Sequence, residues 1–238
     1  MALFRSILYF IGSVFALVTI VSLGLVFFFL PLKHRYKITS QWAKFNIWWL
    51  KVTVGLDYEI IGKENIVNEP CVLISNHQST WETFVFQKVF PQQVWVLKQQ
   101  LLLIPIFGWG LALTAPIKIN RSKKLNALKQ VLTQGVDRLQ RGLWVVIFPE
   151  GTRCKYAKLG KYQSGGVAIA KKAKVKILPV YHNAGKFWAK GQFVKKSGVI
   201  KLVIGKAIEP KKSVTELNDE VYQWTKEQVK IYNTKRLD

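Results

Sequence analysis

The chain has 238 residues, half of them hydrophobic and 13% aromatic, so it can bury a core and is not a disordered chain. Lysine and arginine total 36 against 13 acidic residues, a formal net charge of +23, which predicts an anionic partner such as nucleic acid, lipid headgroups or an acidic protein. The two cysteines, Cys71 and Cys154, indicate neither a disulfide framework nor a zinc site and favour a reducing compartment.

The first feature along the chain is a stretch without charge at residues 6–32. About 20 apolar residues suffice to cross a bilayer core, and this stretch is longer than the apolar region of a cleaved signal peptide. A basic cluster at 33–37 follows it, against a single Arg5 before it, so the positive-inside rule places the remainder in the cytoplasm. The aromatic residues at 41–50 are typical of an amphipathic segment at the membrane surface.

Residues 1–50 are therefore predicted to be a membrane-anchoring helical segment, either a full span or a hairpin in one leaflet. The predicted location is a membrane with the domain that follows facing the cytoplasm, which in a bacterium means the inner membrane. Membrane lipids then account for much of the basic charge, and no zinc-finger spacing or RNA-binding aromatic motif supports nucleic acid as a partner.

Strand-like and helix-like runs alternate after residue 52. The predicted strands lie at 52–55 and 58–61 (a strand pair or one bent strand), 71–75, 94–97, 116–119, 143–148, 175–180 and 199–204. The predicted helices lie at 122–140, 164–172 and 214–232, and the first has an apolar stripe of Leu125, Leu128, Leu132, Val136 and Leu139. The alternation predicts an α/β fold, an αβα sandwich with a largely parallel central sheet, in one domain at 51–238.

Ligand sites in such sheets gather beyond the carboxyl ends of the strands, where Asn76-His-Gln-Ser-Thr-Trp-Glu82 follows one predicted strand. On one continuous helix His77 and Glu82 would point about 140° apart, but they can meet if His77 lies in the loop and Glu82 in the first helical turn. Histidine suits general-base work, and a neighbouring carboxylate fixes its tautomer. A structural interpretation fits equally, with Ser79 and Glu82 as a capping box and His77 as an ordinary loop residue.

A second polar segment, Pro149-Glu-Gly-Thr-Arg153, follows the predicted strand at 143–148. A glycine in a tight turn lets the backbone approach a ligand, threonine donates a hydrogen bond and arginine binds phosphate bidentately. The segment therefore predicts an anion site, with a solvated turn as the alternative.

Together the two segments, Asn-His-x4-carboxylate and then Phe-Pro-Glu-Gly-Thr-Arg, resemble the 1-acylglycerol-3-phosphate acyltransferase family within the glycerolipid acyltransferases. Pro116-Ile-Lys-Ile-Asn-Arg121 is similar to the family's acceptor-binding block, and Ile177-Leu-Pro-Val180 to its short fourth block. Lys98 matches a lysine that the family places near the acceptor phosphate. The blocks occur in family order over residues 53–205.

The resemblance implies an acyl transfer to a lysophospholipid, first of all 1-acylglycerol-3-phosphate, which would give phosphatidic acid. His77 would take the proton from the acceptor hydroxyl, the oxygen would attack an acyl thioester, and Glu82 would orient His77. The implied substrate-binding residues are Lys98, Arg121, Glu150, Gly151, Thr152 and Arg153, with Glu150 either holding its loop or orienting the acceptor. No acyl-enzyme is needed, since neither cysteine lies in the His77 segment, and no metal is expected, because no His/Asp/Glu cluster has ligand spacing. No cofactor is predicted, and acyl-CoA or acyl carrier protein would be the donor substrate.

One residue departs from the family, whose usual acid in the first block is Asp where this chain has Glu82. The extra methylene lengthens the reach and keeps the charge. Two alternative functions remain at this point: transfer to a different lyso-lipid, and a non-catalytic membrane protein that binds anionic lipid. His34 and His182, the other two histidines, are predicted to be interfacial or structural.

Overall fold

The computed structural model describes the backbone of residues 1–119 and 124–233, and the side chains of residues 1–119 and 128–232. Its helices are α1 (Ala2–Val26), α2 (Leu32–Val54), α3 (Trp81–Val89), α4 (Phe107–Ala112), α5 (Lys124–Gln140), α6 (Gly165–Ala173) and α7 (Val214–Asn233). Its strands are β1 (Leu56–Ile61), β2 (Val72–Ser75), β3 (Gln93–Lys98), β4 (Ile117–Ile119), β5 (Trp144–Ile147), β6 (Ile177–His182) and β7 (Gly198–Ile204). Short 3-10 helices lie at η1 (Lys63–Asn65), η2 (Gln99–Leu103) and η3 (Ala184–Lys186).

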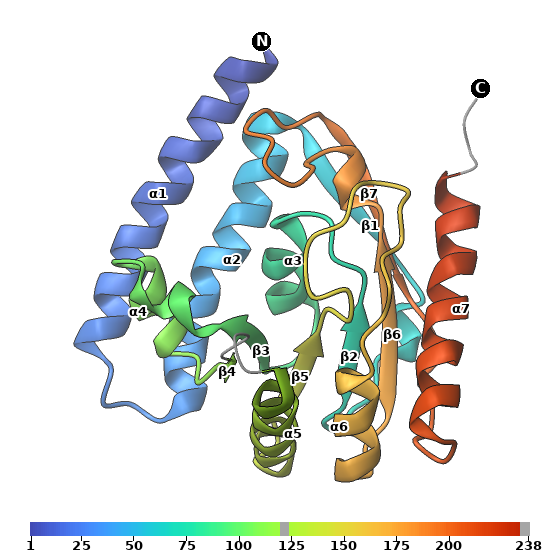
Figure 1. The fold of residues 1–238 in the computed structure, drawn as a ribbon. Coiled ribbons are helices and arrows are strands. Elements are labelled where there is room, and N and C mark those ends of the chain that lie inside the picture. The colour runs from blue at the N-terminus through green and yellow to red at the C-terminus, as the bar shows by residue number, and fades with distance from the viewer. Residues whose placement is uncertain (120–123, 234–238) are drawn as a thin grey trace.

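The described strands form one seven-stranded sheet in the order β1-β7-β6-β2-β5-β3-β4 (Figure 1). The described pairings are parallel except that of β6 with β7. Because β2 pairs with both β5 and β6, the loops after these three strands leave the same edge of the sheet side by side. The predicted strands from residue 71 onward are confirmed in position.

Alternate residues of the central strands face two separate cores. Leu73 of β2 and Val146 of β5 belong to one cluster, which includes side chains of α2 and α3. Their neighbours Val72 and Val145 belong to the other cluster, which includes side chains of α5, α6 and α7. A sheet covered on both faces must be apolar on both sides, which explains the continuous β-branched runs. The predicted αβα sandwich is confirmed.

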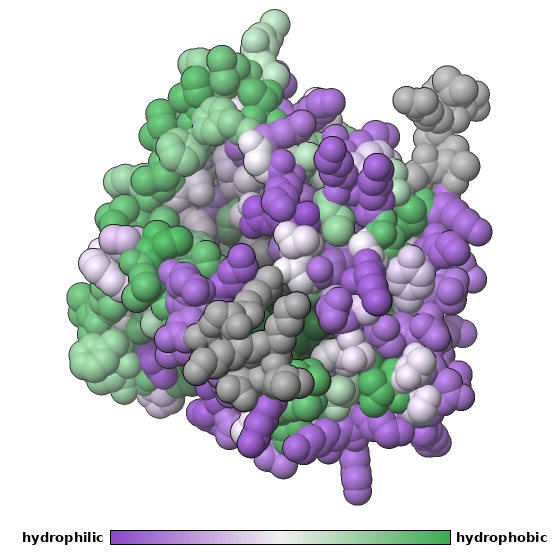
Figure 2. Space-filling model, viewed as in Figure 1, coloured by the Kyte–Doolittle hydropathy of each residue, from purple (hydrophilic) through white to green (hydrophobic). Residues whose placement is uncertain are grey.

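Helices α1 and α2 lie against each other as an antiparallel hairpin (Figure 1). Asn46 of α2 is fully buried and its Oδ1 accepts hydrogen bonds from Tyr9 Oη at 2.5 Å and Ser13 Oγ at 2.6 Å. Trp42 Nε1 donates to the carbonyl of Ser13 at 3.0 Å. Among the described residues, α1 is the helix that is long and apolar enough to cross a membrane. Figure 2 shows hydrophobic residues exposed along it, at the left of the view.

The strand predicted at 52–55 is wrong. Helix α2 continues through Val54, and Thr53 and Val54 are buried. It ends at Gly55, whose φ of 72° is the left-handed conformation that commonly terminates helices. The valine and threonine residues suggested a strand, but burial against the core determines the conformation here. Consequently α2 runs across the domain boundary predicted at residue 50. The aromatic segment 41–50 is part of this helix and has one buried face, so it is not a separate segment at the surface.

The apolar stripe predicted for the helix at 122–140 is partly correct. Leu139 is 4% exposed, and Leu132 packs against the core from a half-buried position. Leu128 is 47% exposed, however, whereas Val131 is buried in its place. The buried face of the described part of α5 is therefore displaced around the helix axis.

The buried Asn46 provides a test of the α1–α2 hairpin. Replacing Asn46 with leucine removes the oxygen that accepts both hydrogen bonds and leaves the Tyr9 hydroxyl, itself 3% exposed, without its partner. An unpaired buried donor costs about 1–3 kcal/mol, so we expect a lower midpoint of thermal unfolding in detergent solution. Gln41→Leu, at an exposed position of the same helix, is the matched control and should change stability by less than about 0.5 kcal/mol. Equal midpoints for both variants would contradict this account of the hairpin.

Candidate active site

The two polar segments singled out in the sequence meet at one edge of the sheet. One follows β2 and the other follows β5, and these strands are parallel neighbours with Ile74 opposite Ile147. The carbonyl of His77 accepts a hydrogen bond from the Cys154 N–H at 2.7 Å. Segments more than seventy residues apart in the chain are thereby joined into one site.

His77 and Glu82 are in direct contact. The His77 Nδ1 and Glu82 Oε1 atoms are 2.7 Å apart, with Glu82 fully buried and His77 partly exposed. His77 lies in the loop and Glu82 in the first turn of α3, which is the arrangement that their spacing required. A proton on Nδ1 that is shared with the carboxylate leaves the lone pair of the neutral ring on Nε2.

The capping-box interpretation is also partly correct. Glu82 Oε1 accepts the N–H of Ser79 at 2.8 Å and that of Gln78 at 2.9 Å, so the carboxylate reaches back to the start of the helix. The Ser79 hydroxyl accepts a hydrogen bond from the N–H of Trp81 at 3.2 Å. In a full capping box it would accept the N–H of the next residue, Glu82. The two interpretations of the segment are therefore compatible, since one oxygen both caps α3 and contacts the imidazole.

Surrounding groups keep the Glu82 carboxyl ionised. Burial alone would raise its pKa, but the hydrogen bonds that its Oε1 accepts from His77 and from the Ser79 N–H outweigh burial and lower the pKa to about 2. The Phe148 ring stacks on the imidazole of His77 with centroids 4.0 Å apart and planes 9° apart. The carboxylate holds the edge of the imidazole and the aromatic ring covers one face, so the ring orientation of His77 is restricted from two directions.

His182, at the end of β6, lies behind this pair and is fully buried. Its Nε2 is 3.0 Å from the carbonyl of Asn76 and 3.7 Å from Glu82 Oε1, while its Nδ1 accepts the N–H of Ala184 at 3.3 Å. The Nε2 therefore carries the proton, and burial lowers the pKa of His182, which favours the neutral ring. Its interior location agrees with the structural role predicted for it, but sequence reasoning missed its proximity to Glu82, which depends on the pairing of β2 with β6.

Glu150 ties the second segment to the first. Its Oε2 accepts the backbone N–H of His77 at 2.9 Å, and its Oε1 accepts the N–H of Gly160 at 3.1 Å. Burial raises the pKa of this carboxyl. Of the two roles considered for Glu150, these contacts correspond to holding the loop.

Four of the other predicted binding residues, Lys98, Gly151, Thr152 and Arg153, lie at the same edge of the sheet. Gly151 adopts a φ of 68°, Thr152 is exposed and accepts a hydrogen bond from Lys190 Nζ at 3.3 Å, and Arg153 is half-buried. Lys98 is exposed at the carboxyl end of β3, opposite Ile119 of β4. Arg121 lies outside the described residues.

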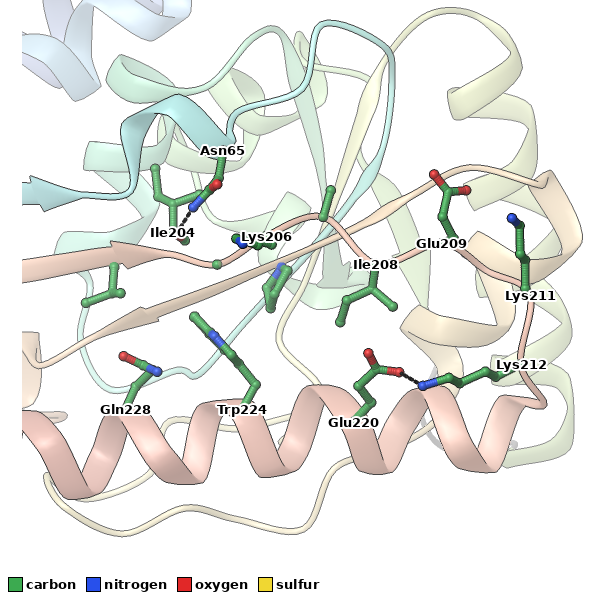
Figure 3. A pocket seen from close by; sticks show the side chains of 14 residues that line it. Asn65, Ile204, Lys206, Ile208, Glu209, Lys211, Lys212, Glu220, Trp224 and Gln228 are labelled. Carbon is green, nitrogen blue, oxygen red and sulfur yellow. Dashed lines mark hydrogen bonds and ion pairs between the residues drawn. The ribbon is translucent and has the colours of Figure 1, made fainter.

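A groove of about 680 Å³ lies elsewhere, between α7 and the segment that follows β7 (Figure 3). Trp224 and Gln228 of α7 and Lys206 are among its lining residues. This segment runs beside the amino-terminal half of β6, since Gly205 N–H donates to the Pro179 carbonyl. The groove is therefore near the opposite end of the strands from His77 and includes none of the predicted site residues.

Comparison with known proteins gives the same family as the motifs. Residues 57–183 match the Acyltransferase family. A 1-acyl-sn-glycerol-3-phosphate acyltransferase of Pseudomonas aeruginosa is 45% identical over 203 residues, which cover 83% of this chain and 79% of that protein. A protein of the same name from Saccharomyces cerevisiae is 34% identical over 149 residues, or 59% of this chain and 48% of the relative.

The fold has a close counterpart among solved structures. The crystal structure of a 1-acyl-sn-glycerophosphate acyltransferase from Thermotoga maritima superposes with a TM-score of 0.82 over 99% of this chain and 98% of the other, at 23% identity. That likeness supports the fold, and the matched domain together with the Pseudomonas relative supports the family. The chain belongs to the Acyltransferase family, among its 1-acyl-sn-glycerol-3-phosphate acyltransferases.

Proposed function

We propose that this protein transfers a fatty acyl group from an acyl thioester to the free hydroxyl of 1-acylglycerol-3-phosphate, giving phosphatidic acid in phospholipid biosynthesis. The observation that supports it most is the contact between the partly exposed His77 and the fully buried, ionised Glu82 beside the Glu-Gly-Thr-Arg loop. The names of the relatives at 45% and 34% identity point to the same acceptor.

In this proposal His77 is the general base and Glu82 its orienting partner. Nε2 of His77 takes the proton of the acceptor hydroxyl, and the oxygen forms a bond to the thioester carbonyl carbon. The tetrahedral intermediate then expels the thiolate, which receives the proton from His77. The Glu82 carboxylate stabilises the imidazolium between these steps, since it is hydrogen-bonded to Nδ1.

The acceptor phosphate is assigned to the basic rim of the site. Lys98, Arg121 and Arg153 supply the charge, and Thr152 with the backbone of Gly151 shapes the turn. The donor is an acyl group on coenzyme A or on a carrier protein. It is consumed as a substrate, and we propose that no cofactor or metal takes part.

We further propose that the protein is attached to a membrane, with the acyltransferase domain on the cytoplasmic side. Helix α1 is long and apolar enough to span a bilayer, but protein covers one side of it along much of its length. Trp49 Nε1 donates to the Leu8 carbonyl near one end, and Gly24 lies against Leu113 near the other. A helix covered in this way favours attachment to one leaflet rather than a free span.

Turnover by the purified protein with lysophosphatidate and fatty acyl thioesters, on coenzyme A and on carrier protein, tests the function directly. We expect His77→Ala to lower kcat by on the order of 10²–10⁴-fold, because a general base contributes that much. His34→Ala, at an exposed histidine of α2, is the matched control and should retain full activity. Full transfer by His77→Ala would refute the mechanism, and a wild type that transfers to no lyso-lipid would favour a lipid-binding protein.

The roles of the rim residues can be separated from catalysis by steady-state kinetics. Lys98→Gln and Arg153→Gln should each raise the KM for lysophosphatidate by about tenfold or more, because a charge-assisted hydrogen bond to phosphate is lost. The KM for the donor should change little. Lys230→Gln, at an exposed lysine of α7, controls for the change in overall charge. An unchanged acceptor KM would remove that residue from the phosphate site.

Glu82 gives a prediction for activity and another for pH. Glu82→Asp should retain activity if the carboxylate orients His77, whereas Glu82→Gln should lower kcat by on the order of 10²-fold or more, because the amide cannot stabilise an imidazolium. Equal activity of both variants would reduce Glu82 to a helix cap.

The pH dependence follows from the low pKa of this carboxyl, about 2 in the folded chain. A depressed pKa gives stability that is fully present above the unfolded value of about 4.5 and is lost as pH falls through the folded value. The unfolding midpoint of the wild type should therefore exceed that of Glu82→Gln at pH 5, and this margin should shrink as the pH falls toward 2. A margin that does not change between pH 5 and pH 2 would show that Glu82 is not ionised in the folded protein.

A further inference from the structure

The loop between β6 and β7, residues 183–197, carries an exposed apolar tip. Phe193 is 43% exposed and Val194 is 38% exposed, between Lys190 and Lys196. Adjacent apolar side chains flanked by lysines are typical of segments at a membrane interface, where the apolar groups enter the lipid and the ammonium groups stay in the headgroup layer.

This tip adjoins the exposed face of α1. The rings of Phe193 and Phe10 meet edge to face, with centroids 5.7 Å apart, and Phe10 is itself 51% exposed. The backbone N–H of Lys195 donates to Ser6 Oγ at 2.9 Å. The loop therefore lies beside the N-terminal half of α1, near the top of Figure 1, and the contact of Phe193 with Phe10 joins its apolar side chains to those of the helix.

Lys195 fixes the tip to α1. The side chain is 3% exposed, and its Nζ lies 4.8, 4.7 and 4.9 Å from the ring centroids of Tyr9, Trp188 and Phe193. It also donates to the Phe193 carbonyl at 2.7 Å. An ammonium group desolvated among aromatic rings is attracted to each ring face. Because one of these rings belongs to α1 and two belong to the loop, the loop tip and the helix are held as one unit.

We propose that Phe193 and Val194 form a second bilayer contact, which enters the lipid interface beside α1, with Lys190 and Lys196 at the headgroups of anionic lipids. This inference rests on the proposed membrane attachment of α1, since the same lipid surface covers both. Charge and continuity favour a lipid surface over a protein partner: the tip extends an apolar face that is long enough to meet a bilayer, and lysines surround it.

The contact has a consequence for the candidate active site. Lys190, three residues before the tip, donates to Thr152 in the loop that holds Arg153. A tip anchored in lipid therefore holds Lys190 beside Thr152, next to the residues that we propose bind the acceptor phosphate.

Fluorescent reporters at single cysteines test the contact in the full chain. The background is Cys154→Ala, in which the remaining Cys71 is fully buried and inaccessible to the label. The environment-sensitive dye NBD is attached at Val194→Cys, at Phe15→Cys on the exposed face of α1, and at Glu227→Cys on the exposed side of α7. Each protein is reconstituted in vesicles of phosphatidylcholine and phosphatidylglycerol, with a doxyl-labelled lipid or aqueous iodide as the quencher.

The reporter at 194 should show blue-shifted emission, be quenched by the doxyl lipid as strongly as the reporter at 15, and be protected from iodide. The reporter at 227 should show the reverse. If the reporter at 194 is quenched by iodide and not by lipid while the reporter at 15 is quenched by lipid, the loop contact is refuted and the attachment of α1 stands. If the reporter at 15 is also quenched by iodide alone, both are refuted, whatever the result of the acyl-transfer assay.

Discussion

The buried Oε1 atom of Glu82 is the constraint that shapes the candidate site. An isolated carboxylate inside a protein is strongly destabilising unless donors surround it. Here the donors are the N–H groups of Gln78 and Ser79 and the ring of His77, all from the few residues before α3. To present three donors to one oxygen, the chain must leave β2, fold back and begin a helix at once. The imidazole is thereby placed at the carboxyl edge of the sheet.

The same constraint accounts for glutamate where the family usually has aspartate. Glu82 is the second residue of α3, and a glutamate in the first helical turn suits a side chain that reaches back to the backbone before the helix. Glu82 does this while it also contacts His77, so the additional methylene gives one residue two partners. The departure from the family pattern is consistent with the predicted role, and it depends on His182 and Asn76, which close the interior side of the loop.

Much of the architecture could be predicted from the sequence, and the parts that could not depend on distant contacts. The β-branched runs located β5 and β6 because strands buried on both faces need such residues, but the same residues at Val52 and Val54 lie at the end of a helix. The contact of His77 with Glu82 was one of two interpretations that the local spacing allowed. The position of His182 beside them did not, since it requires β6 to pair with β2, and no local pattern specifies that pairing.

Residues 1–50 were predicted to be a membrane-anchoring helical segment, and in the structure α1 packs against the body that holds the site. Buried polar contacts with Asn46 join it to α2, and α2 shares its core with α3, the helix that carries Glu82. Separating α1 from α2 would leave buried donors unpaired, so a rigid attachment is favoured over a hinge. The height of His77 above a bilayer that receives α1 is then set by side-chain packing. Under the proposed function, an acceptor whose acyl chain stays in the lipid would have to reach His77 at that height, because α1, α2 and α3 pack together.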